Sequence, residues 1–171
     1  MKTALYFGSF NPTHIGHLKI IQSLLDRNYK VEIIISPHNP HKDQKDLMNF
    51  DDRLNILLYS IHDFIKNPKN LHVNPVEQYL PKPNYTYLTL RELEKYHNHK
   101  DMAIVMGSDV LFNLHKWKNY EEVIKYPIIN IDRKVDSRVT NFDILSEVNI
   151  IEKIMVNDET SSTEIRIMMK N

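Results

Sequence analysis

Short apolar runs alternate with longer segments of helical periodicity along this chain. Apolar residues recur at three- and four-residue spacings from Leu18 to Leu25, which predicts one buried helix face. The almost continuous β-branched run at residues 31–35 is typical of a strand that is covered on both faces. The pattern predicts strands at 3–7, 31–35, 71–73, 103–106, 128–131 and 150–156, and helices at 17–28, 51–64, 85–96, 120–125 and from 162 onward. Alternation of this kind predicts an α/β fold with a mainly parallel sheet flanked by helices.

The bulk composition excludes several classes of protein. A chain of 171 residues has the length of one domain with a sizeable core, and 42% hydrophobic with 26% charged residues is typical of a globular protein. Because 22 Lys and Arg balance 22 Asp and Glu, no overall field draws the chain to nucleic acid or an anionic membrane. The absence of cysteine excludes disulfides, thiolate metal sites and thiol nucleophiles. Without a signal-peptide core or an apolar run of about 18 residues, we expect a cytoplasmic protein.

Glycine is rare in this sequence, and its positions are informative. Only Gly8, Gly16 and Gly107 occur, whereas an average usage of ~7% would give about a dozen. Each lies after or near the end of a predicted strand. In open α/β sheets, ligands bind at the carboxyl ends of the strands, so these positions predict where backbone approaches a ligand.

The segment at residues 8–17 joins the first predicted strand to the first predicted helix. A glycine turn in this position leaves backbone N–H groups and the positive end of a helix dipole available to an anion. His14 and His17 add imidazole donors, and Gly16 lets a phosphate approach the backbone. On the residues alone, two other interpretations stay open: ordinary loop and cap histidines, or a metal-binding pair at three-residue spacing.

Residues 8–17 also match a known pattern. G-x-F-x-P-x-H-x-G-H resembles the hallmark of the nucleotidyltransferase superfamily, which includes nicotinate mononucleotide adenylyltransferases, pantetheine-phosphate adenylyltransferases and several cytidylyltransferases. The resemblance implies a Rossmann-like fold in which His14 and His17 contact ATP phosphates in the transition state. It implies that the other motif positions bind ATP, namely Gly8, Ser9, Phe10 and Gly16.

A second motif lies near the other end of the chain. Ser161 and Glu164 fit a capping box at the start of a helix, with Arg166 in its first turns. A serine-capped helix with a solvated arginine would explain this segment by itself. The run S-S-T-E-I-R is, however, similar to the superfamily's second phosphate-binding signature. The resemblance implies that Arg166 is catalytic and that Ser161, Ser162 and Thr163 bind ATP.

Three further segments resemble the P-S-Y-T, G-x-D and K-W segments of bacterial nicotinate mononucleotide adenylyltransferases. They are Pro83-Asn84-Tyr85-Thr86, Gly107-Ser108-Asp109 and Lys116-Trp117. The resemblance implies that Trp117, the single tryptophan, stacks on a pyridine ring, although core or surface packing is its commoner role. Tyr85 and Thr86 would bind the mononucleotide, with Thr86 and nearby amides facing its carboxylate. Gly107 and Asp109 would hold adenosine or ribose hydroxyls.

Two basic residues complete the implied site. The loop at residues 37–42 resembles the family's N-x-P-P-H-K segment with one proline missing, so Lys42 would be a catalytic cation rather than a solvated loop lysine. Arg133 matches a family arginine near the mononucleotide phosphate, although Asp132 stands beside it where relatives often have a second basic residue. The nucleotidyltransferase domain would occupy residues 1–171, with a C-terminal helical region shorter than is usual for the family.

The resemblance implies adenylyl transfer from ATP to nicotinate mononucleotide, giving deamido-NAD and pyrophosphate. The acceptor is a phosphate monoester whose second pKa is about 6, so it needs no general base. We expect Mg²⁺ held mainly by the ATP phosphates, with no dedicated protein ligand set, and a homo-oligomer is possible. The alternatives are a sister transferase with a nicotinamide mononucleotide, phosphopantetheine or cytidylyl acceptor, and a non-catalytic nucleotide-binding module. The tetrapeptide HIGH also occurs in class I aminoacyl-tRNA synthetases, whose lysine-rich second loop is absent from this sequence.

Overall fold

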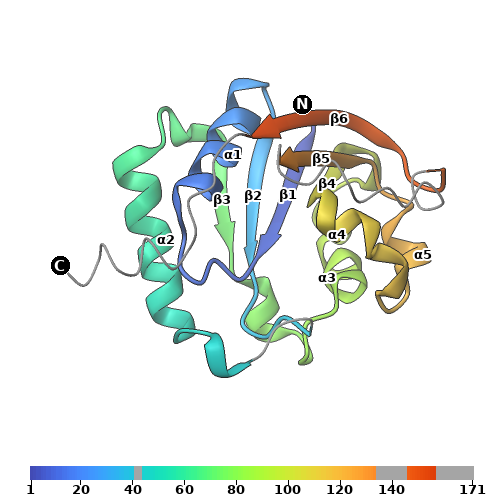
Figure 1. The fold of residues 1–171 in the computed structure, drawn as a ribbon, viewed down its shortest axis with the longest axis horizontal. Helices are drawn as coiled ribbons and strands as arrows, with labels where there is room; N and C mark the ends of the chain where they lie inside the picture. Colours follow the sequence, from blue (N-terminus) through green and yellow to red (C-terminus); the bar gives the residue numbers. More distant parts are fainter. Residues whose placement is uncertain (41–43, 134–145, 157–171) are drawn as a thin grey trace.

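Six parallel strands form the centre of the molecule in the computed structural model, which describes residues 1–40, 44–133 and 146–156 (Figure 1). They lie in the order β3-β2-β1-β4-β5-β6, and each neighbouring pair is parallel. The strands are β1 (Thr3–Gly8), β2 (Lys30–Ile35), β3 (Leu71–Asn74), β4 (Met102–Gly107), β5 (Ile128–Arg133) and β6 (Ile150–Val156). The α-helices are α1 (Ile15–Asp26), α2 (Phe50–Phe64), α3 (Thr86–Leu93), α4 (Ser108–Phe112) and α5 (Tyr120–Val123). The predicted α/β, Rossmann-like fold is confirmed.

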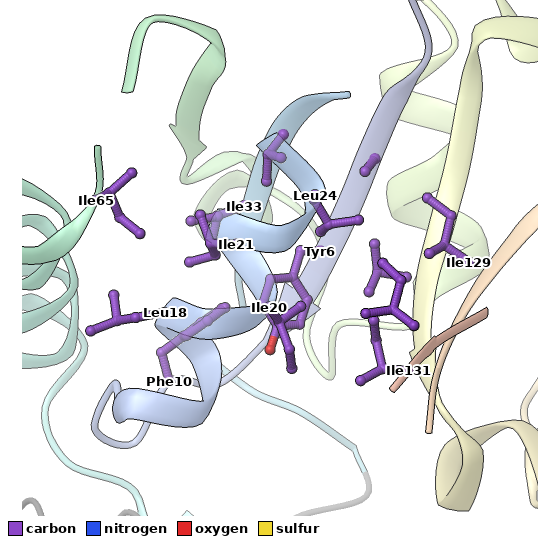
Figure 2. Packing of buried hydrophobic residues seen from close by; sticks show 14 of the residues in the cluster. Tyr6, Phe10, Leu18, Ile20, Ile21, Leu24, Ile33, Ile65, Ile129 and Ile131 are labelled. Carbon is purple, nitrogen blue, oxygen red and sulfur yellow. The ribbon is translucent and has the colours of Figure 1, made fainter. Parts of the chain in front are cut away.

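Helices cover both faces of the sheet. α1 and α2 lie on one face, whereas α3, α4 and α5 lie on the other (Figure 1). Along β1, Tyr6 packs toward α1 and Leu5 packs toward α3, because successive side chains of a strand point to opposite faces. Ile21 of α1 belongs to the same buried cluster as Ile33 of β2 (Figure 2). Burial on both faces explains why the central strands read as continuous apolar runs.

The predicted elements differ from the observed ones mainly at their ends. The first helix begins at Ile15 rather than at residue 17, and α3 ends at Leu93 rather than at residue 96. The short helix α4 was not predicted, because five residues are too few for a helical periodicity to show. The predicted helix from residue 162 onward lies outside the described residues, so the extent of the domain over 1–171 stays a prediction. Among the described helices, none is both long and apolar enough to cross a membrane.

The strand order indicates that a ligand site lies at the carboxyl ends of β1 and β4. The chain leaves β1 to form β2 and β3 on one side, then returns to form β4, β5 and β6 on the other side. The connections therefore diverge at the carboxyl ends of β1 and β4, which leaves a crevice where ligands bind in sheets of this kind. Gly8 ends β1 and Gly107 ends β4. Two of the three glycines in the chain thus lie at this edge.

Candidate active site

A cavity of about 720 Å³ opens at the carboxyl edge of β1 and β4. It is lined by these residues from the predicted site: Gly8, Ser9, Phe10, His14, His17, Tyr85, Thr86, Gly107, Asp109 and Trp117. Gly16 lies against the ring of His14, and Arg133 is the last residue of β5. The other predicted site residues lie outside the described part of the chain: Lys42, Ser161, Ser162, Thr163 and Arg166. The structure thus unites the first motif with the predicted acceptor segments in one cavity.

The two histidines cap the first turn of α1 in a reciprocal arrangement. The His14 backbone N–H donates to Nδ1 of His17 at 3.0 Å, and the His17 backbone N–H donates to Nδ1 of His14 at 3.4 Å. Their rings stack with centroids 3.8 Å apart. A ring nitrogen that accepts a hydrogen bond carries no proton, so in the neutral rings the proton is assigned to Nε2. Each imidazole therefore has an N–H donor on the side away from the helix backbone.

Gly16 and Phe10 hold this pair in place. A Cβ atom on Gly16 would lie 2.7 Å from Cε1 and 2.9 Å from Nδ1 of His14, so a larger residue would displace that ring. Phe10 is buried and adopts a φ of 48°, in the left-handed region that is uncommon for side chains of this size. Its ring contacts that of Tyr6, with centroids 5.4 Å apart, and that of His17, with centroids 4.8 Å apart. The histidine pair thus packs against the aromatic rings of Phe10 and Tyr6.

A buried arginine that sequence reasoning missed joins the loops that follow β1 and β2 to the segment that precedes α2. Arg53 of α2 is 1% exposed, and its guanidinium donates to four backbone carbonyls. The acceptors and distances are Ser9 (2.7 Å), Ser36 (2.8 Å), Met48 (2.9 Å) and Pro37 (3.3 Å). Burial lowers the pKa of this guanidinium from its ordinary value. The signal in the sequence was an arginine four residues before Leu57, on the apolar face of the predicted helix.

The cavity wall also contains the predicted acceptor segment. Asn84 is buried and joins this segment to the loop after β2: its N–H donates to the His38 carbonyl at 2.9 Å, and its Oδ1 accepts from the His38 N–H at 3.1 Å. Its Nδ2 donates to the Glu77 carbonyl at 2.9 Å. These bonds fix the backbone that leads into Tyr85 and Thr86. Asn84 stands where the resembling motif has serine, and its role was not predicted.

Glu77 places a buried carboxyl on the same wall. Its side chain is 2% exposed, and Oε2 accepts a hydrogen bond from the Thr89 hydroxyl at 2.6 Å. Burial raises the pKa of the Glu77 carboxyl to about 7, although the hydroxyls of Thr89 and Ser36 and the charge of Lys82 oppose that rise. This group therefore changes charge near neutral pH inside the cavity wall.

Replacing Glu77 by glutamine is expected to change how stability depends on pH. The folded-state pKa of about 7 lies above the ordinary value of 4.5. The contribution of the Glu77 carboxyl to stability is therefore complete below pH 4.5 and is lost as the pH rises through 7. In urea unfolding, the free energy of unfolding of the wild type, relative to that of Glu77→Gln, should fall by roughly 2 to 3 kcal/mol between pH 5 and pH 8. The exposed Glu121→Gln variant should follow the wild type, and a Glu77→Gln curve parallel to the wild-type curve would contradict the assignment.

The fold and the cavity define a class of protein. It is an α/β protein with a cavity of nucleotide size at the point where the connections of a parallel sheet diverge. The start of a helix capped by histidines lies beside that cavity. A family model described as cytidylyltransferase-like matches residues 5–167. The chain is 37% identical to a probable nicotinate-nucleotide adenylyltransferase of Flavobacterium psychrophilum, covering 100% of this chain and 88% of the relative. A second relative of that description, from Flavobacterium johnsoniae, is 35% identical over 99% of this chain and 87% of its own length.

Solved structures agree on the fold. The structure of Plasmodium falciparum nicotinic acid mononucleotide adenylyltransferase complexed with NaAD matches with a TM-score of 0.75 and 20% sequence identity. The match covers 98% of this chain and 83% of that chain. The chain belongs to the cytidylyltransferase-like family of nucleotidyltransferases and, within it, to the nicotinate-nucleotide adenylyltransferases.

Proposed function

We propose that this chain transfers the adenylyl group of ATP to nicotinate mononucleotide, forming deamido-NAD and pyrophosphate. The observation that carries the proposal is the convergence, in one cavity, of the histidine-capped helix start with the acceptor segment around Tyr85, Thr86 and Trp117. The names of the relatives support the same acceptor. The volume of about 720 Å³ lies within the range typical of sites for small ligands.

In the proposed reaction, an anionic phosphate oxygen of the mononucleotide attacks the α-phosphorus of ATP. The new P–O bond forms as the bond from the α-phosphorus to the bridging oxygen breaks, and pyrophosphate leaves with that oxygen. No proton must be removed from the attacking group, because a phosphate monoester is mostly dianionic at neutral pH. The main barrier is therefore the repulsion between two anionic substrates and the charge that grows on the transferred and leaving groups.

Our proposal assigns the stabilisation of that charge to His14 and His17. Their Nε2 protons would donate to phosphate oxygens, while the first-turn N–H groups of α1 supply further positive potential. Because the rings are already fixed by the helix cap, little reorganisation would accompany the reaction. Lys42 and Arg166 are proposed to add cations to the same phosphates, with Ser161, Ser162 and Thr163 as further donors.

The proposal includes a Mg²⁺ ion bound through the nucleotide. Among the described residues, no group of three or more His, Asp or Glu side chains is arranged to hold a metal ion. The proposed ion is held by phosphate oxygens and water, which is common for Mg²⁺ at nucleotide sites. When bound, the ion would neutralise part of the triphosphate charge.

The proposed activity is tested by an acceptor comparison. The purified chain is incubated with ATP, Mg²⁺ and, in parallel, nicotinate mononucleotide, nicotinamide mononucleotide or phosphopantetheine, and pyrophosphate release is measured. The highest kcat/KM is expected with nicotinate mononucleotide. A clear preference for phosphopantetheine would replace the proposed acceptor, and ATP binding without pyrophosphate release from any acceptor would indicate a nucleotide-binding module instead.

A further inference from the structure

Lys118 is the one lysine or arginine among the described residues that line the cavity. It directly follows Trp117, and its Nζ lies 5.0 Å from the centroid of the Tyr85 ring. An ammonium over the face of a tyrosine ring is attracted by the ring quadrupole, which restrains an otherwise flexible side chain. The charge thus lies in the cavity wall over the Tyr85 ring, and Lys118 follows Trp117 directly in the chain.

The other charged side chains described on the cavity wall are acidic. They are Asp46, Glu77 and Asp109. Nicotinate mononucleotide and nicotinamide mononucleotide share their ribose and phosphate and differ only in the ring substituent, a carboxylate in one and a neutral amide in the other. Acidic groups in the described wall disfavour a further negative charge, and a cation beside the ring would offset that repulsion for the acid. An ammonium beside the pyridine ring would therefore add to the Thr86 hydroxyl and nearby amides that are expected to face the carboxylate.

We propose that Lys118 determines acceptor specificity by pairing with the carboxylate on the pyridine ring. The inference rests on the proposed function, because it concerns the acceptor of that reaction. The ammonium has three N–H donors, and its contact with the Tyr85 face leaves donors for a ring held against Trp117. The ammonium can donate to either acceptor, but only the acid offers a charged oxygen and so forms an ion pair with it. Lys118 therefore contributes to the difference between the two acceptors.

The test measures kcat/KM for both mononucleotides with Lys118→Met, which removes the charge and keeps a long apolar stem. We expect kcat/KM for nicotinate mononucleotide to fall about tenfold and that for nicotinamide mononucleotide to change less than about twofold. Lys118→Arg keeps the charge and should retain most of the preference. Lys69→Met, which removes an exposed lysine before the amino end of β3, should leave both values unchanged.

The outcomes separate this inference from its alternatives. An equal fall for both acceptors would assign Lys118 to the phosphate that they share, and no change for either would leave it a solvated lysine; both results overturn the proposal. If the wild-type chain turns over neither mononucleotide, the proposed function fails and the inference fails with it. A fall in kcat/KM that is confined to nicotinate mononucleotide supports both the proposed function and this inference.

Discussion

Replacing His17 by alanine is expected to lower kcat about 10²- to 10³-fold, which is the usual effect of losing one well-placed donor to a transition-state oxyanion. The variant loses the Nε2 proton that the proposed mechanism directs at a phosphate oxygen. It also loses Nδ1, which accepts the His14 N–H and so helps to position the other ring. The measurement is steady-state pyrophosphate release at saturating substrates, together with thermal unfolding.

A second substitution separates catalysis from capping. Glutamine at this third helical position can accept the same backbone N–H, as it does in a capping box, but it has no stacked ring to fix a donor at the position of imidazole Nε2. His17→Gln should therefore be close to wild type in stability and nearly as slow as His17→Ala. His62→Ala, at an exposed position of α2, should have wild-type activity. Normal turnover in His17→Gln would remove His17 from the mechanism.

Replacing Arg53 by methionine is expected to lower the free energy of unfolding by roughly 2 to 4 kcal/mol. Four backbone carbonyls lose their donor, and each buried acceptor left without a partner costs about 1 kcal/mol or more. Removing a buried charge offsets part of that loss, because burial already disfavours the charged form. Urea unfolding at neutral pH measures the difference.

A matched control is Arg27→Met on α1's C-terminal cap. Arg27 is largely exposed and pairs with Glu152 at 3.1 Å, so its removal should cost less than about 1 kcal/mol. If Arg53→Met lost no more stability than Arg27→Met, the guanidinium would not be what joins α2 to the turn that follows β1. We also expect lower activity in Arg53→Met, because the Ser9 carbonyl lies in that turn.

The sheet could be predicted from the sequence because its strands are covered on both faces. Residues 31–35 were predicted as a strand from their β-branched run, and the observed β2 is Lys30–Ile35. The order of the strands is set by long-range pairing and had no comparable local signal. α4 was missed because Ser108–Phe112 is shorter than two helical turns, so no periodicity develops.

The first motif of the site could also be predicted from the sequence. The first motif is contiguous in sequence, so its glycine turn, its histidines and its helix start could be interpreted together. Arg53, Glu77 and Asn84 lie outside it and act through backbone carbonyls or buried polar contacts, which depend on tertiary packing alone. Lys42 and Arg166 lie outside the described residues, so the roles predicted for them stay predictions.

The most direct test of the central claim is a crystal structure of the chain with a non-hydrolysable ATP analogue and nicotinate mononucleotide. The account predicts triphosphate oxygens within hydrogen-bond distance of Nε2 of His14 and His17, and the pyridine ring against Trp117. A nucleotide bound elsewhere, with both imidazoles out of reach of any phosphate, would contradict it.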